Sequence, residues 1–183
     1  PRCRFPAARD SSHHRCAALA RAPLPLIFSY KSEKYLCGTG VCPQFDTVWH
    51  DLTVQQHLEF YSRVKGIESS AAHIAARSVA MKVGLDGDPY GKLASALSGG
   101  MRRRLSIAIA LIGNPDIVFF DEPTTGLDPE TRRQLWDIIK REQSDGRCVI
   151  ITTHSMEEAD ALCSRIGCAS LALSPLPLIF SYK

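Results

Sequence analysis

The fold is decided by one stretch of this 183-residue sequence, Ile117-Val118-Phe119-Phe120-Asp121-Glu122-Pro123. Four apolar residues in a row, followed by two acids and a proline, are typical of a short buried strand in a parallel sheet. A carboxylate at the carboxyl end of such a strand can hold Mg²⁺ on a nucleotide, and that role falls to Asp121. The next residue, Glu122, can polarise an attacking water as a general base. The alternative is that Asp-Glu-Pro only ends a strand and starts a turn.

The second half of the chain contains another buried strand, at 148–152, and two further helices. One helix has Pro129 at its first position and runs to about residue 143. The other opens with a capping box formed by Ser155 and Glu158 and runs to about residue 165. Because strands that alternate with helices pack as a parallel sheet covered by those helices, we predict an α/β fold with a parallel sheet core.

Three helices are predicted in the first half of the chain, and together they form a helical lobe at about 51–112. Their ranges are about 53–65, 70–83 and 100–112. Thr53 and Gln56 form a capping box at the start of the first helix. Three successive arginines, Arg102, Arg103 and Arg104, lie in the first turns of the third helix, and we predict that they form a solvated face rather than a binding patch.

Charge and repetition distinguish the two ends of the chain from its middle. Six of the 22 Lys/Arg residues but only one of the 19 Asp/Glu residues lie in 1–31. The rest of the chain is therefore slightly acidic and lacks the positive charge typical of a nucleic-acid-binding domain. The peptide PLPLIFSYK occurs at 23–31 and again at 175–183. We therefore predict an Arg-rich flank at 1–31 that ends in this peptide, a globular domain at 32–168, and a tail at 169–183 that repeats the peptide.

The sequence contains neither a membrane-spanning run nor a zinc-binding pattern of cysteines. No run reaches the roughly 18 apolar residues of a membrane-spanning helix, so a role at a membrane needs an anchor from another segment or chain. The seven cysteines match no zinc-binding spacing.

The predicted third helix opens with Leu97-Ser98-Gly99-Gly100-Met101, a sequence that can bind an anion. Glycines allow a ligand to approach the backbone closely, and the free N–H groups and dipole of a helix N-terminus favour negative charge. Ser98 adds a hydroxyl donor. The alternative is a Ser-Gly-Gly turn that only caps the helix.

Three more polar residues stand where predicted elements meet. Gln44 lies between an extended segment and the helical lobe, where it can touch Mg²⁺ or the attacking water; the alternative is a glutamine in a surface turn. His154 follows the strand at 148–152, and a neutral imidazole there can hydrogen-bond a phosphate oxygen; the alternative is a satisfied histidine beside a helix cap. Asp128 can contact a partner across a dimer seam and can also cap the helix that starts at Pro129.

Taken in this order, these residues resemble the ATP-binding cassette (ABC) family. The matching motifs are the Q-loop CPQFD at 42–46, the signature LSGGM at 97–101, the Walker B strand IVFFDE at 117–122, the D-loop GLD at 126–128 and the H-loop residue His154. The resemblance covers about 35–168. The methionine of LSGGM and the segment at 40–66 look most like the A subfamily, whose members often move lipids.

The resemblance implies a partial P-loop NTPase domain, in which a parallel sheet core carries a three-helix signature lobe, with ATP and Mg²⁺ as cofactors. It implies the ATP-binding and ATP-hydrolysing domain of a transporter at the cytoplasmic face of a membrane. The partners implied are a second nucleotide-binding domain, in a head-to-tail dimer, and a transmembrane domain, with no nucleic acid. By role, the residues implied are Glu122, His154 and Gln44 for catalysis, Ser98, Gly99, Gly100 and Asp128 for nucleotide binding, and Asp121 and Gln44 for the metal.

The sequence departs from the family pattern in two places. The phosphate-binding loop GxxxxGK[ST] (Walker A) does not occur in residues 1–40, and from residue 168 onward CASLALSPLPLIFSYK replaces the expected closing strands. We therefore expect an N-terminally truncated domain that does not bind ATP appreciably by itself. The alternatives are a catalytically dead fragment and a soluble ABC ATPase that acts on ribosomes or DNA; only 54 residues separate Gln44 from Ser98, which leaves no room for a long coiled coil.

Overall fold

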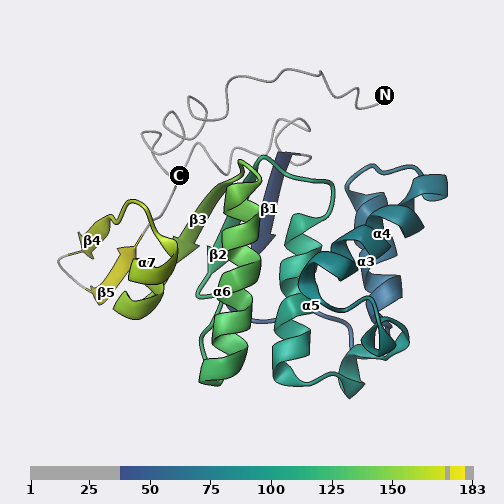
Figure 1. Cartoon of the computed structure of the whole chain (residues 1–183), viewed down its shortest axis with the longest axis horizontal. Helices are drawn as coiled ribbons and strands as arrows, with labels where there is room; N and C mark the ends of the chain where they lie inside the picture. Colours follow the sequence, from purple (N-terminus) through teal and green to yellow (C-terminus); the bar gives the residue numbers. More distant parts are fainter. Residues whose placement is uncertain (1–37, 172–173, 180–183) are drawn as a thin grey trace.

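A three-stranded parallel sheet and five helices form the main body of the part of the chain that the computed structural model describes, residues 38–171 and 174–179 (Figure 1). The helices are α3 (Val54–Val64), α4 (Ser69–Val83), α5 (Gly99–Leu111), α6 (Pro129–Ser144) and α7 (Met156–Leu162). The strands are β1 (Thr39–Cys42), β2 (Ile117–Asp121), β3 (Cys148–Thr152), β4 (Cys168–Leu171) and β5 (Ser174–Ile179). The predicted α/β fold, with its parallel sheet core and helical lobe, is confirmed.

The sheet has the order β1-β2-β3, so β2, the strand that ends at Asp121, lies in the middle. The register places Phe119 of β2 between Val41 of β1 and Ile150 of β3. Val118 and Phe120 are buried in the core, and a side chain of this kind contributes about 1.5–3 kcal/mol to stability when fully buried. Phe119, which alternates with them, is only half-buried, so β2 is fully buried on one face and not on the other.

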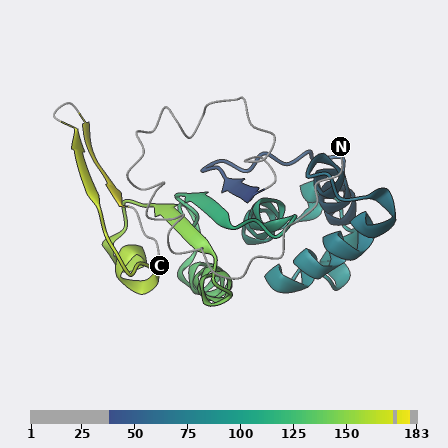
Figure 2. The ribbon, with the colours of Figure 1, turned by 90° about the horizontal axis from the view of Figure 1, so that it is seen from above.

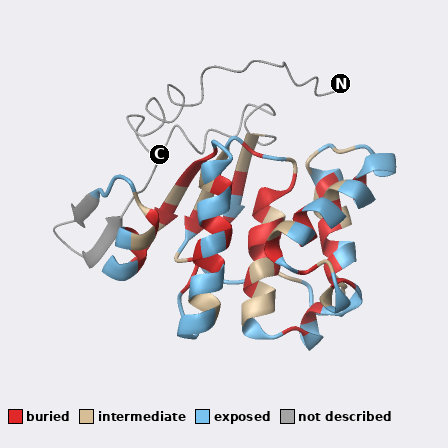
Figure 3. Ribbon diagram, in the orientation of Figure 1, coloured by how far each residue is buried: buried red, intermediate tan, exposed pale blue. Residues whose placement is uncertain are grey.

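Helix α5 connects the lobe to the sheet, since it packs against α3 and α4 on one side and against β1 and β2 on the other. Leu58 of α3, Ala80 of α4 and Phe120 of β2 consequently belong to one buried cluster. Figure 3 shows buried segments in the helices of the lobe, in α5 and in the strands of the sheet. The lobe is also linked to α6, because Lys82 of α4 lies 3.3 Å from the buried carboxylate of Glu142.

The absence of a side chain at Gly40 lets β1 approach α5 closely. A Cβ atom at this position would overlap the backbone carbonyl of Ala110 in α5. Cys42, two residues further along β1, is fully buried on the same side of the strand. The residues that follow β1, which form the Q-loop, are therefore held against the first turns of α5.

The predicted helix starts are present at the expected residues, and one helix end differs. Thr53 forms the predicted capping box with Gln56. Ser155 caps α7, but the capping box predicted with Glu158 is only half formed, because the Glu158 carboxylate bonds Thr124 and Trp136 instead. Helix α7 ends at Leu162, three residues before the predicted end, because Cys163 adopts an extended conformation with φ −102° and ψ 128°.

Strands β4 and β5 pair in an antiparallel hairpin, at the end of the molecule opposite the helical lobe (Figure 2). Residues 175–179 of the second PLPLIFSYK copy lie in β5, whereas the first copy and the predicted flank at 1–31 lie outside the described residues. Within the described ranges, no helix has the length and apolar character needed to cross a membrane.

A buried histidine fixes the loop that leads into α3. The Nε2 atom of His57 accepts a hydrogen bond from the backbone N–H of Trp49 at 2.9 Å, and its Nδ1 atom lies 2.8 Å from the carbonyl oxygen of Thr53. Both contacts are satisfied by the neutral ring with its proton on Nδ1. Burial lowers the pKa of His57 below its ordinary value of 6.5, and the bond to Thr53 opposes this shift in part.

The first prediction concerns the effect of pH on the lobe. Because the pKa of His57 is lower in the folded chain, the unfolded chain binds a proton first as pH falls, and folding stability decreases below about pH 6.5. Urea unfolding at about pH 7.5 and pH 5.5 measures how much the free energy of unfolding falls between the two pH values. This loss of stability should be smaller for His57→Gln than for the unmodified chain. The exposed His73 provides the control, and His73→Gln should retain the full loss. Equal losses in all three proteins would contradict the assignment to His57.

Candidate functional site

The three parallel strands bring three of the predicted catalytic residues to one edge of the sheet. Gln44 follows β1 by two residues, Glu122 directly follows β2, and His154 follows β3 by two residues. Because the carboxyl ends of parallel strands meet at the same edge, residues 78 and 32 positions apart in the sequence become neighbours. The site is therefore a direct product of the sheet topology.

The carboxylate of Glu122 is the point at which these side chains meet. Gln44 Nε2 donates a hydrogen bond to Glu122 Oε2 at 2.9 Å, and His154 Nδ1 lies 3.3 Å from Glu122 Oε1. Thr125 adds a hydroxyl donor to Oε2 at 3.0 Å. Both carboxylate oxygens thus have polar partners, which orient the group while 22% of its side-chain surface stays exposed to solvent.

The backbone at Glu122 has an unusual conformation. Its φ of 43° lies in the left-handed region, which costs a residue with a side chain about 1–3 kcal/mol. The Glu122 N–H donates to the carbonyl oxygen of Thr152 at 3.0 Å and has a second contact with the Thr152 hydroxyl at 3.2 Å, and these bonds to β3 hold the turn in place. Strained conformations of this kind cluster at functional sites, because the surrounding structure must maintain them.

Asp121, the predicted metal ligand, is exposed at the end of β2. Its Oδ1 atom accepts a hydrogen bond from the hydroxyl of Thr152, the residue paired with it in β3. Asp121, Thr152 and Gln44 offer oxygen atoms that suit Mg²⁺ as ligands, because this ion prefers one or two carboxylates and takes its remaining ligands from water and phosphate. In the described part of the chain no group of three or more His, Cys, Asp or Glu side chains is arranged as a metal site.

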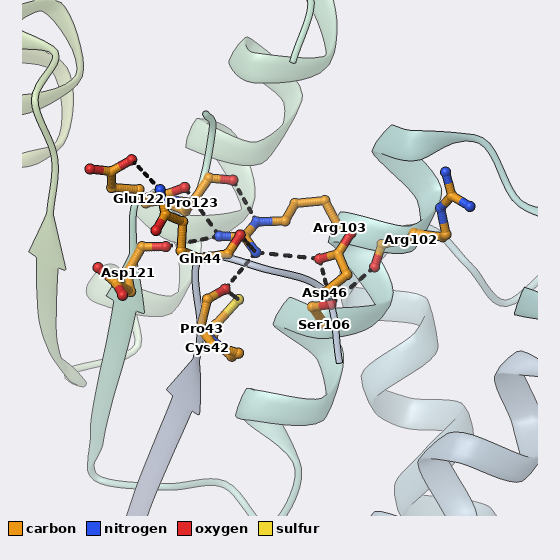
Figure 4. Close-up of polar contacts among 10 residues, drawn as sticks. All are labelled: Cys42, Pro43, Gln44, Asp46, Arg102, Arg103, Ser106, Asp121, Glu122 and Pro123. Atoms are coloured by element: carbon orange, nitrogen blue, oxygen red, sulfur yellow. Dashed lines mark hydrogen bonds and ion pairs between the residues drawn. The ribbon is translucent and has the colours of Figure 1, made fainter. Parts of the chain in front are cut away.

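Arg103 is the residue for which the sequence-based interpretation is wrong. It is only 4% exposed rather than solvated, while Arg102 and Arg104 are half-exposed. The signal that could have found it is its position four residues before Ile107 and seven before Ala110, which places it on the buried face of α5. Its guanidinium contacts the backbone of both the Q-loop and the end of β2 (Figure 4).

The signature residues lie at the N-terminus of α5, where they also cap the helix, as the alternative interpretation predicted. Ser98 is the N-cap, and its hydroxyl oxygen accepts a hydrogen bond from the Met101 N–H at 3.2 Å. Ser98 and Gly99 are exposed, and nothing lies within 4 Å of the place where a Cβ atom at Gly99 would stand. Gly100 differs, because a Cβ atom there would come to 2.6 Å from the Cγ2 atom of Thr131 in α6. Packing therefore explains Gly100 but does not explain Gly99.

Asp128 and the loop before it are fixed by separate hydrogen bonds. Asp128 caps α6, and the bond from the Thr131 N–H at 2.9 Å lowers the pKa of this exposed carboxyl group. Further back in the loop, the Thr124 hydroxyl donates to the fully buried carboxylate of Glu158 at 2.8 Å. Glu158 also accepts from the indole of Trp136 at 3.2 Å, so the loop after β2 is tied to the helix that follows His154.

Known proteins resemble this chain over most of its described length. A family model described as "AAA domain, putative AbiEii toxin, Type IV TA system" matches residues 87–160. The chain is 53% identical over 128 residues to ABC transporter A family member 9 of Arabidopsis thaliana, a match that covers 70% of the chain and 13% of that protein. It is 50% identical over 135 residues to ABC transporter A family member 10 of the same plant, covering 73% of the chain and 15% of the relative.

These relatives confirm the resemblance to the ABC transporter A family, and the match to an AAA domain model agrees with the partial P-loop ATPase fold. The chain spans only 13–15% of the length of these two relatives.

The second prediction separates the two signature glycines. Gly99→Ala should leave the free energy of unfolding unchanged or slightly higher, because the space is open and alanine favours a helix. Gly100→Ala should lower it by about 1–3 kcal/mol, since the new methyl group overlaps Thr131. Adding Thr131→Ser, which removes the overlapping Cγ2 atom, should restore most of this loss. Urea unfolding measures all three variants, and a larger loss in Gly99→Ala than in Gly100→Ala would show that the packing argument is wrong.

Proposed function

From the finding that about 70% of this chain is homologous to members of the ABC transporter A family, we propose that it forms part of the ATP-binding and ATP-hydrolysing domain of a transporter. The observation that carries the proposal is the meeting of Gln44 and His154 on the carboxylate of Glu122. Hydrolysis at this site powers movement of a substrate across a membrane, and lipid is the substrate class that the A-subfamily resemblance favours.

Glu122 acts as the general base in this proposal. A base must lie within hydrogen-bond reach of the water that it activates, and the exposed part of its carboxylate allows water to approach. Gln44 and Thr125 donate to one oxygen of the carboxylate, and these two hydrogen bonds fix its direction. His154 lies beside the other oxygen, and because a neutral imidazole has a single N–H, that N–H would turn from Glu122 to a phosphate oxygen when the nucleotide binds.

Magnesium with ATP supplies the charge that stabilises the phosphates during the reaction. Asp121 would hold the ion, with Gln44 beside it, because both present oxygen atoms at the strand ends. The hydrogen bond from Thr152 keeps the Asp121 carboxylate oriented along the sheet edge.

The N-terminus of α5 would close over a nucleotide held by a second nucleotide-binding domain in a head-to-tail dimer. The exposed Ser98 and the open space at Gly99 support this, since a phosphate could reach the first N–H groups of the helix. Asp128, which is exposed one residue before α6, would lie at the same seam.

The transmembrane domain would dock where the Q-loop meets the helical lobe. Three large apolar side chains, Phe45, Trp49 and Phe60, are exposed there, at 77%, 46% and 46%. The Trp49 ring packs edge-on against Phe60, with 5.2 Å between the ring centres, so part of this surface is one aromatic patch. A patch of neighbouring exposed aromatic side chains is typical of an interaction surface.

The third prediction tests the general base in a hybrid transporter. In this hybrid, the segment of ABC transporter A family member 9 that the chain matches is replaced by the chain's own residues, so that the family's phosphate-binding loop precedes them. Glu122→Gln keeps the shape of the side chain and removes the base, and kcat should fall roughly 10²–10⁴-fold while ATP still binds. The exposed Glu130 gives a matched control, and Glu130→Gln should be near normal. Near-normal turnover of Glu122→Gln would rule out the assignment.

The fourth prediction tests docking in the same hybrid. A cysteine at the exposed Thr47 should crosslink to a cytoplasmic loop of the transmembrane domain, as located by mass spectrometry. A cysteine at Ser144, at the end of α6, serves as the control and should not form this crosslink. Crosslinks from Thr47→Cys only to soluble proteins would count against a transporter. Asp46 is left unchanged, because its carboxylate is bonded to α5.

A further inference from the structure

Arg103 joins two parts of the site that lie far apart in the sequence. On one side, its Nε atom donates to the carbonyl oxygen of Pro123 at 2.7 Å. Its Nη2 atom donates to the carbonyl oxygens of Asp121 at 3.0 Å and Glu122 at 3.1 Å. These three acceptors form the turn that holds Glu122 in its left-handed conformation.

The same guanidinium holds the Q-loop. Its Nη1 atom donates to the carbonyl oxygens of Pro43 at 2.6 Å and Gln44 at 3.1 Å, and lies 3.3 Å from Asp46 Oδ1. Ser106, one turn later in α5, donates to the same Asp46 oxygen at 2.8 Å. Figure 4 shows Arg103 between the two segments, with the Q-loop residues and the end of β2 both facing its planar group.

Two physical features make this link specific to arginine. A guanidinium presents five N–H donors in a rigid plane, whereas the ammonium group of lysine presents three at a single point. A buried charge is also costly unless every donor finds a partner, so the surrounding carbonyl groups and Asp46 are needed to keep Arg103 buried. Arg103 and its acceptors therefore hold one another in place.

We propose that Arg103 is a positioning residue that sets the contact between Gln44 and Glu122. The reasoning is geometric: the backbone carbonyl groups of both residues bond to one guanidinium, so their side chains meet at a fixed separation. Arg103 lies five residues after the cap Ser98 on α5, and the same helix consequently links the signature end to the carboxylate. The assignment of a role in catalysis rests on the proposed function; the mechanical link does not.

Cys42 provides a reporter of this link in the full 183-residue chain. Its thiol is fully buried directly before Pro43, and burial raises its pKa from 9.0 to about 12, with the charge of Arg103 opposing the shift. Release of the Q-loop would expose the buried thiol and accelerate its alkylation.

The experiment measures iodoacetamide labelling of Cys42 by peptide mass spectrometry, together with hydrogen exchange of the Glu122 and Thr125 amides. Arg103→Met and Arg103→Lys should each raise both rates about tenfold or more, since a hydrogen bond from a charged donor contributes enough to stability to account for that factor. Exchange of the Val149 and Ile151 amides in β3 reports general loosening and should change much less.

Arg102→Met is the matched control, because Arg102 is the neighbouring arginine on α5 and is half-exposed; it should leave both rates unchanged. The proposal is overturned if Cys42 labelling stays constant or slows in Arg103→Met. It is also overturned if labelling rises no more than exchange in β3, or if Arg103→Lys behaves like the unmodified chain. These measurements need no nucleotide, so their failure is distinct from failure of the proposed function, which the Glu122→Gln hybrid tests.

Discussion

At Gly40 the first strand of the sheet lies so close to α5 that no side chain fits between the strand and the carbonyl group of Ala110. The strand runs antiparallel to the helix, since Gly40 meets Ala110 near the helix end and Asp46 meets Ser106 nearer its start. This contact determines where the Q-loop emerges. The guanidinium of Arg103 is within reach of Pro43 and Gln44 only because β1 ends beside the first turns of α5.

The turn after β2 shows how the remaining structure supports an unfavourable local conformation. A left-handed residue with a side chain needs compensation, and Glu122 receives it from two directions. Its N–H is bonded to Thr152 of β3, and its carbonyl oxygen is bonded to Arg103 of α5. The direction of the Glu122 carboxylate thus depends on both the sheet and the helix, and any movement of α5 relative to β3 acts on it.

Local signals were sufficient to predict much of the fold, because they act within a few residues. The caps Thr53, Ser98 and Asp128 each bond a backbone N–H three residues later, so sequence alone locates these helix starts. The meeting of Gln44, Glu122 and His154 is less local: the family resemblance implied a common role for them, and the parallel topology of the sheet brings them together. The burial of Arg103 follows from its place on the buried face of α5, but its partners could not be predicted, since most of them are backbone carbonyl groups, which every residue carries and no sequence pattern distinguishes.

A structural role and a ligand-binding role are compatible at the capping residues, and hydrogen-bond capacity shows why. The hydroxyl of Ser98 uses a lone pair to accept from Met101, so its own proton stays available for a phosphate oxygen. Asp128 accepts from the Thr131 N–H through Oδ2, and the two oxygens of this exposed carboxylate have further lone pairs that can accept from a partner. The caps therefore do not discriminate between the two roles. Gly99 differs from them, because neither packing nor the helix cap requires a glycine there, whereas the proposed approach of a phosphate to the backbone would be easiest at a residue without a side chain.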